Sequence, residues 1–114
     1  MHFTLKRPCA DCPFRTDCTK GWLGRSRARQ ISLAITAQQQ TFACHKTTKH
    51  DEEGEVYSDS DAQHCAGALI LLEKLNQPNQ LMRIAERLRA YDRTKLDMAS
   101  PVFDTTAAFV KHHA

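Results

Sequence analysis

Four cysteines carry the clearest chemical signal in this chain. They are a CxxC pair and two single residues: Cys9, Cys12, Cys44 and Cys65. The two intervening residues of a CxxC pair let the chain turn back, so that both thiolates can reach one metal. Four thiolates complete either a closed tetrahedral zinc site or a [4Fe–4S] cluster. The spacing therefore predicts one metal centre held by all four cysteines.

Three further side chains are reserve candidates for this centre, namely Cys18, His45 and His64. Cys18 is close in sequence to the CxxC pair. His45 directly follows Cys44, and His64 directly precedes Cys65. Adjacent residues do not easily ligate the same ion, so the two histidines are expected to be hydrogen-bonding or surface residues more often than ligands.

The residue types leave the metal open between zinc and a cluster, because thiolate sites suit both. Zn²⁺ is favoured by its frequency in small intracellular domains and by the nearby histidines. A [4Fe–4S] cluster is favoured by the scattered four-cysteine set and by Pro13 directly after Cys12. We expect one metal centre, with Zn²⁺ slightly favoured over [4Fe–4S].

Size and composition predict a single metal-binding domain over residues 1–114. A chain of 114 residues supports one core, and its apolar residues are mainly Ala and Leu, so the core is thin. A metal site that forms only in the folded state would add its binding free energy to folding. No apolar run reaches the roughly 20 residues needed to span a bilayer, and residues 1–8 lack the features of a secretory signal. We therefore expect no membrane segment and a cytoplasmic location, where cysteine clusters bind metal more often than they form disulfides.

Apolar periodicity and turn residues predict an α+β domain, predominantly α, with three to four helices and a short β element around the four-cysteine centre. Helices are expected over residues 26–40, 65–76, 78–91 and 105–112. Short extended segments are expected over residues 41–44 and 56–57. Residues 1–24 are expected to be irregular and held by their cysteines.

Side-chain patterns within these helices predict what each one buries. The helix over 65–76 is apolar almost all round and is expected to lie at the centre of the domain. The helix over 78–91 is expected to bury Leu81, Ile84, Ala85 and Leu88. The last helix is expected to begin at an Asp104 cap and to leave His112 and His113 solvated.

The charge is divided unevenly along the chain. Residues 1–50 carry nine Lys and Arg against two acids, whereas residues 51–114 carry seven against eleven. The basic half suits an anionic partner, although the two halves would also attract each other. Arg15, Arg25 and Arg29 are the candidate nucleic-acid contacts, because Arg25 and Arg29 share one helix face and aromatic residues stand nearby.

The motifs CxxCPFR, FxCHKT, CAGALI, PNQLMRIAERLRAYD and PVFD together resemble a family of small proteins of unknown function encoded in phage and bacterial genomes. The resemblance covers residues 9–15, 42–47, 65–70, 78–92 and 101–104. It implies that the shared cysteines are the four ligands named above and that Cys18 is not one of them. It also implies a phage or prophage origin, and hence the host cytoplasm.

Three classes of function follow from these patterns. The first is a metal-stabilised binding module that acts on nucleic acid or on a host protein. The second is a [4Fe–4S] redox or sensing protein. An enzyme is least expected, because the CxxC pair lacks the strand and helix context of a thioredoxin-like dithiol and no catalytic triad, phosphate loop or paired-carboxylate motif stands out. The sequence does not determine the oligomeric state.

Overall fold

The structure, a computed structural model, describes residues 3, 5–8, 12–42, 49–50, 56–57 and 63–114. The elements in chain order are α1 (Arg25–Ile35), strands β1 (Lys49–His50) and β2 (Val56–Tyr57), α2 (Ala66–Lys74), α3 (Gln80–Arg87), the 3-10 helix η1 (Arg93–Lys95) and α4 (Thr106–His113). The described residues thus form four α-helices with little strand, which confirms the predominantly helical prediction.

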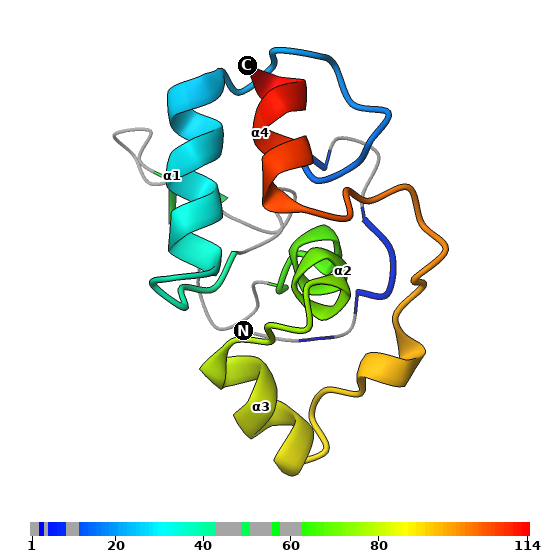
Figure 1. The fold of residues 1–114 in the computed structure, drawn as a ribbon. Coiled ribbons are helices and arrows are strands. Elements are labelled where there is room, and N and C mark those ends of the chain that lie inside the picture. Colours follow the sequence, from blue (N-terminus) through cyan, green and yellow to red (C-terminus); the bar gives the residue numbers. More distant parts are fainter. Residues whose placement is uncertain (1–2, 4, 9–11, 43–48, 51–55, 58–62) are drawn as a thin grey trace.

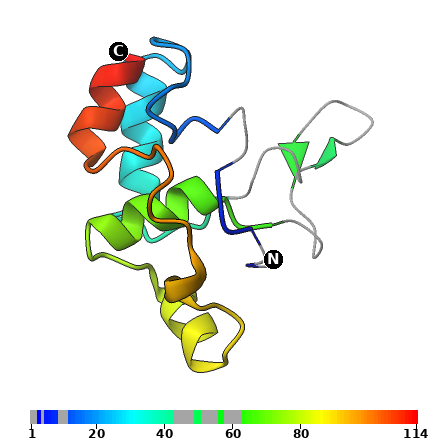
Figure 2. The same ribbon diagram turned by 90° about the vertical axis from the view of Figure 1, so that its right-hand side faces the viewer.

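Helix α2 is the centre of the domain. Every side chain from Ala66 to Leu72 is buried, as expected for a helix that is apolar all round. Helices α1 and α4 lie on one side of α2 and α3 lies on the other (Figure 1, Figure 2). A stacked pair of rings, Phe14 on Phe109 with centroids 5.0 Å apart, joins the N-terminal segment to α4 over this core.

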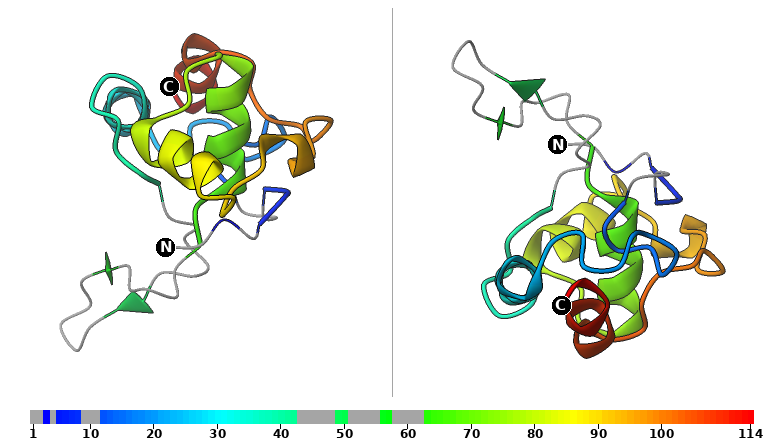
Figure 3. Two further views of the ribbon diagram at one scale, coloured as in Figure 1. Left: turned by 90° about the horizontal axis from the view of Figure 1, so that it is seen from below. Right: turned by 90° about the horizontal axis from the view of Figure 1, so that it is seen from above.

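Strands β1 and β2 form a short antiparallel hairpin in which Lys49 pairs with Tyr57 and His50 pairs with Val56. The hairpin stands apart from the helices in the views of Figure 3. The expected strand at 56–57 is therefore present. The expected extended segment at 41–44 is not a strand at residues 41 and 42, and its last two residues lie outside the described part of the chain.

Helix α1 is shorter than the expected helix over 26–40. It ends at Ile35, and the Ser32 carbonyl accepts from both the Thr36 N–H at 3.1 Å and the Thr36 hydroxyl at 2.6 Å. Gln39 then adopts a positive φ of 53°, and a right-handed helix cannot continue through a residue in this conformation. At its other end α1 begins at Arg25, and its N-cap Gly24 provides no capping side chain.

Helices α3 and α4 also begin one or two residues from their expected starts. The side chain of Asn79 caps α3 by accepting from the Met82 N–H at 2.8 Å. Thr105 caps α4 through the Ala108 N–H, whereas the expected cap, Asp104, forms an ion pair with Lys74 at 3.0 Å.

Four residues were expected to be buried in this part of the chain, and the prediction is wrong for three of them. Leu81, Ile84 and Leu88 are 37%, 45% and 74% exposed. Only Ala85 of the expected set is buried, together with Met82. The helix contacts the core along one edge of its apolar face, so the other edge remains open to solvent.

Candidate metal centre

Two of the four predicted ligands lie together in the core. Cys12 and Cys65 are buried, reduced, and separated by 3.6 Å between their Sγ atoms, although 53 positions separate them in the chain. Cys65 is the N-cap residue of α2, and its N–H donates to the Phe42 carbonyl at 2.7 Å. The Cys12 carbonyl accepts from the Arg15 N–H in a turn. Both thiols are therefore held by the backbone around them.

Gly67 permits this close approach. A Cβ at position 67 would lie 2.6 Å from Cys12 Sγ and 3.0 Å from the Cβ of Phe14. These separations are shorter than van der Waals contact, so only glycine lets the first turn of α2 lie against Cys12. The sequence signalled the glycine only as part of the CAGALI motif.

The separation of the two sulfurs fits one tetrahedral ion. Zn–S bonds of about 2.3 Å at tetrahedral angles place two sulfurs about 3.8 Å apart. In a [4Fe–4S] cluster each thiolate binds a different iron, so the cysteine sulfurs lie further apart. The 3.6 Å contact between Cys12 and Cys65 is therefore closer to the zinc geometry.

Without a cation, the surroundings of Cys12 favour its protonated thiol. The contact with the Cys65 thiol, followed by burial, raises the pKa of Cys12 far above its usual value. A divalent cation would reverse this balance at Cys12, because it stabilises the thiolate that burial otherwise disfavours.

The other two predicted ligands, Cys9 and Cys44, and the reserve candidate His45 lie outside the described residues. Among the described residues, no group of three or more Cys, His, Asp or Glu side chains is placed to hold a metal ion. The structure thus brings together Cys12 and Cys65 as half of the predicted set.

The reserve candidate His64 is fully buried beside Cys65 and stacks on Phe3, with ring centroids 5.2 Å apart. Burial lowers its pKa to about 4, so the imidazole is neutral. Neither ring nitrogen has a hydrogen-bond partner among the described residues. His64 therefore stays a reserve candidate.

The reserve candidate Cys18 contacts a histidine that the sequence placed in solvent. His113 is buried, which corrects that expectation, and its Nε2 lies 3.7 Å from Cys18 Sγ. However, Nε2 donates to the Pro13 carbonyl at 2.8 Å, and Nδ1 accepts from the Leu23 N–H at 3.4 Å. The imidazole therefore cannot take a proton from Cys18, whose own pKa is raised by burial.

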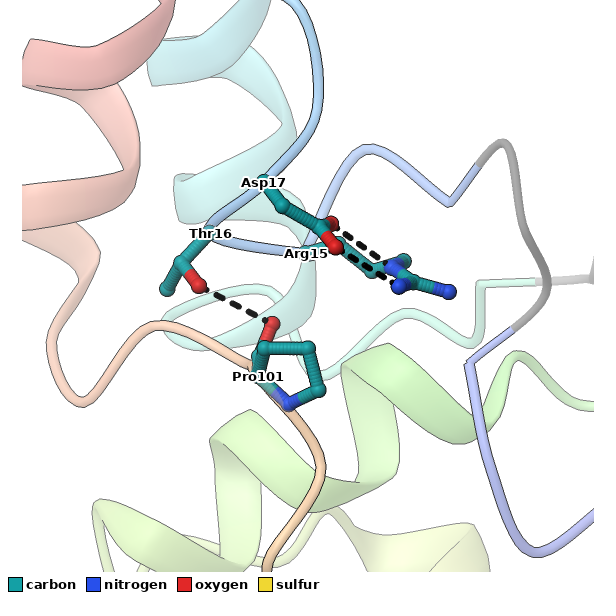
Figure 4. A network of polar contacts seen from close by, with 4 residues as sticks. All are labelled: Arg15, Thr16, Asp17 and Pro101. Atoms are coloured by element: carbon teal, nitrogen blue, oxygen red, sulfur yellow. Dashed lines mark hydrogen bonds and ion pairs between the residues drawn. The ribbon is translucent and has the colours of Figure 1, made fainter.

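The second half of the CxxCPFR motif pairs with the PVFD motif near the C-terminus. Arg15 and Val102 form an antiparallel bridge, and the Thr16 N–H donates to the Pro101 carbonyl at 2.7 Å. Figure 4 shows this junction, where the Thr16 hydroxyl also donates to the Pro101 carbonyl. The arrangement anchors the segment that carries Cys12.

The three predicted nucleic-acid contacts do not lie together. Both Nε and Nη2 of Arg15 donate to the carboxylate of Asp17, at 2.8 and 2.7 Å, as Figure 4 shows. This pairing neutralises part of the charge of Arg15. Arg25 and Arg29 instead line a groove between α1 and α4.

A family model of unknown function, DUF6283, matches residues 4–114. The chain belongs to this family. The DUF6283 match extends over the four α-helices and both strands of the described residues, which confirms the predicted membership of a family of unknown function. The motif details and a phage origin remain predictions. No curated protein and no solved structure shows significant similarity to the chain. None of the helices in the described part of this DUF6283 protein has the length and apolar content needed to cross a bilayer.

Proposed function

We propose that this chain is a small metal-binding module in which Cys9, Cys12, Cys44 and Cys65 hold one structural zinc ion. The observation that carries the proposal is the buried contact between Cys12 and Cys65, with 3.6 Å between sulfurs that are not joined by a disulfide. Two thiols at this separation form one edge of a zinc tetrahedron.

The chain length on either side of this pair supports the other two ligands. Cys9 precedes Cys12 by three residues, and Cys44 follows Phe42 by two. Phe42 is hydrogen-bonded directly to Cys65. Because each residue spans at most about 3.6 Å, both cysteines are within reach of the pair.

A closed four-thiolate site has a structural consequence. Zinc supplies four strong bonds and no redox chemistry, so its binding free energy contributes to folding. The ion would fasten the CxxCPFR segment and the FxCHKT segment to the first turn of α2. The module then acts by presenting the surfaces of its helices to a partner, either nucleic acid or a host protein.

The test is the metal content and spectrum of anaerobically purified protein, followed by replacement with Co²⁺. We expect one zinc per chain, no colour, and the absorption of a tetrahedral cobalt–thiolate complex after replacement. Cys12→Ser and Cys65→Ser should lose the metal, whereas the matched control Cys18→Ser should retain it.

A brown protein that contains iron and sulfide would contradict the zinc site and support the alternative, a [4Fe–4S] protein with a redox or sensing role. A metal-free protein with a Cys12–Cys65 disulfide would refute both forms of the proposal. A metal site that survives in Cys12→Ser and Cys65→Ser would show that other residues are the ligands.

A further inference from the structure

Helices α1 and α4 run antiparallel beside each other (Figure 1). Side chains from both helices line an open groove. The groove has a volume of about 560 Å³, which is within the range of ligand sites. Its main lining residues are Arg25, Arg29, Ser32, Leu33, Val110 and Lys111. The first four come from α1 and the last two from α4.

The groove is positively charged. Arg25, Arg29 and Lys111 line it, no acidic residue does, and none of the three forms an ion pair with a described residue. Helix α1 begins at this end without a side-chain cap or an acid in its first turn. The positive end of its dipole therefore adds to the three cations.

The groove also offers a hydrogen-bonding group and an apolar wall. Ser32 is only 8% exposed, and its Oγ has no hydrogen-bond partner among the described residues. Beside it, Leu33 is 56% exposed although it is a large apolar residue, and Val110 of α4 also lines the groove. A ligand that combines negatively charged, hydrogen-bonding groups with a flat apolar surface would match the cations, the Ser32 hydroxyl and the apolar wall.

We propose that this groove binds single-stranded nucleic acid. Arg25 and Arg29 are one helical turn apart, a rise of about 6 Å, which is comparable with the spacing of consecutive phosphates in an extended strand. Lys111 contacts a phosphate from the opposite wall, and the bases or sugars lie on Leu33 and Val110. The groove does not include the four cysteines, so the proposal does not depend on the metal.

The experiment measures the affinity of the full chain for a short fluorescent oligothymidylate across a salt series. Three phosphate contacts predict a slope of log K against log salt of about −2. Arg25→Glu/Arg29→Glu should weaken binding at low salt by about tenfold or more and reduce the slope by about 1.4, and Lys111→Glu should reduce it by about 0.7.

The matched control is Arg83→Glu/Arg87→Glu, which makes the same change in net charge on exposed residues of α3, on the other side of α2 (Figure 1). This control should change the Kd for the oligothymidylate by no more than about twofold, because the effect of exposed charges is screened beyond about 10 Å. All variants are first matched to the parent chain by circular dichroism.

Three outcomes would overturn the proposal. One is the absence of oligothymidylate binding at low salt, and another is an equal loss in the two double variants. The third is competition by polyglutamate or by adenosine monophosphate as strong, per charge, as competition by unlabelled strand. Polyglutamate competition would indicate a general polyanion effect, and mononucleotide competition would indicate a free-nucleotide site.

Discussion

Single residues decide whether the two buried cysteines can meet. Cys12 and Cys65 were evident from their type and spacing, but their contact depends on the missing side chain of Gly67. In the same way, the segment that follows Cys12 is held by His113, which donates to the Pro13 carbonyl from the end of α4. Neither supporting residue has a chemical signature of its own in the sequence.

The first residue-scale prediction concerns Gly67→Ala. In an ordinary helix this change would stabilise the protein by about 0.4–1 kcal/mol. Here the added Cβ would lie 2.6 Å from Cys12 Sγ, so we expect a loss of about 1–3 kcal/mol and weaker zinc binding. Urea unfolding with and without zinc measures both the loss of stability and the weaker zinc binding. A variant as stable as the parent chain would show that Cys12 can move without cost.

The second residue-scale prediction concerns pH. Burial lowers the pKa of His113 below its usual 6.5, so below that pH the unfolded chain binds a proton that the folded chain does not. The stability contributed by neutral His113 is therefore present near pH 7 and decreases as the pH falls through about 6.5 towards the folded-state pKa.

His113→Gln should remove this part of the acid dependence. It should also destabilise the protein at pH 7 by about 1–3 kcal/mol, because the partners of a buried group lose their hydrogen bonds. His112→Gln is the matched control, since His112 adjoins it in α4 but is only half-buried. Equal acid dependence in the parent chain and His113→Gln would contradict the assignment.

At the scale of the elements, helices α2 and α3 differ in how they use their apolar residues. Helix α2 is buried on all sides from Ala66 to Leu72, so this whole stretch contributes to the core. Helix α3 contacts the core only through Met82 and Ala85. Its apolar periodicity is strong, but periodicity identifies a face of a helix and does not show how much of that face is covered.

The prediction at this scale compares the same substitution in the two helices. Leu69→Ala in α2 should destabilise the protein by about 2–5 kcal/mol, because it leaves a cavity in the core. Leu88→Ala at the end of α3 should change stability by no more than about 0.5 kcal/mol, because that side chain is already solvated. Equilibrium urea unfolding measures both. A large loss for Leu88→Ala would mean that α3 is covered in solution.

At the scale of the whole molecule, distant parts of the chain close on one another around α2. The segment after Cys12 pairs with residues near 101–103, and Phe42 is hydrogen-bonded to Cys65. A metal bound at Cys12 and Cys65 would join these same segments. Such a metal and the hydrophobic core would therefore stabilise one unit.

The prediction at this scale is that zinc stabilises the whole domain. A ligand that binds only the folded state stabilises it by about 2.7 kcal/mol at one hundred times its Kd. We expect the melting temperature to rise with zinc concentration and to fall after chelation, as measured by circular dichroism. The matched control Cys18→Ser should respond like the parent chain, and Cys65→Ser should not respond. An unchanged melting temperature on chelation would argue against a structural ion.

The sequence by itself determined the chemistry of the candidate site and the type of most elements. Thiol chemistry depends on residue identity, and helical periodicity is a local property, so Cys12, Cys65 and the central helix α2 were predictable. Tertiary structure alone decided that these two thiols meet at 3.6 Å, that His113 is buried, that Leu88 is exposed, and that Arg25 and Arg29 share a groove with Lys111 while Arg15 is paired with Asp17. Each of these outcomes depends on contacts between residues far apart in the chain or on how completely a neighbour covers a face, and no local pattern contains that information.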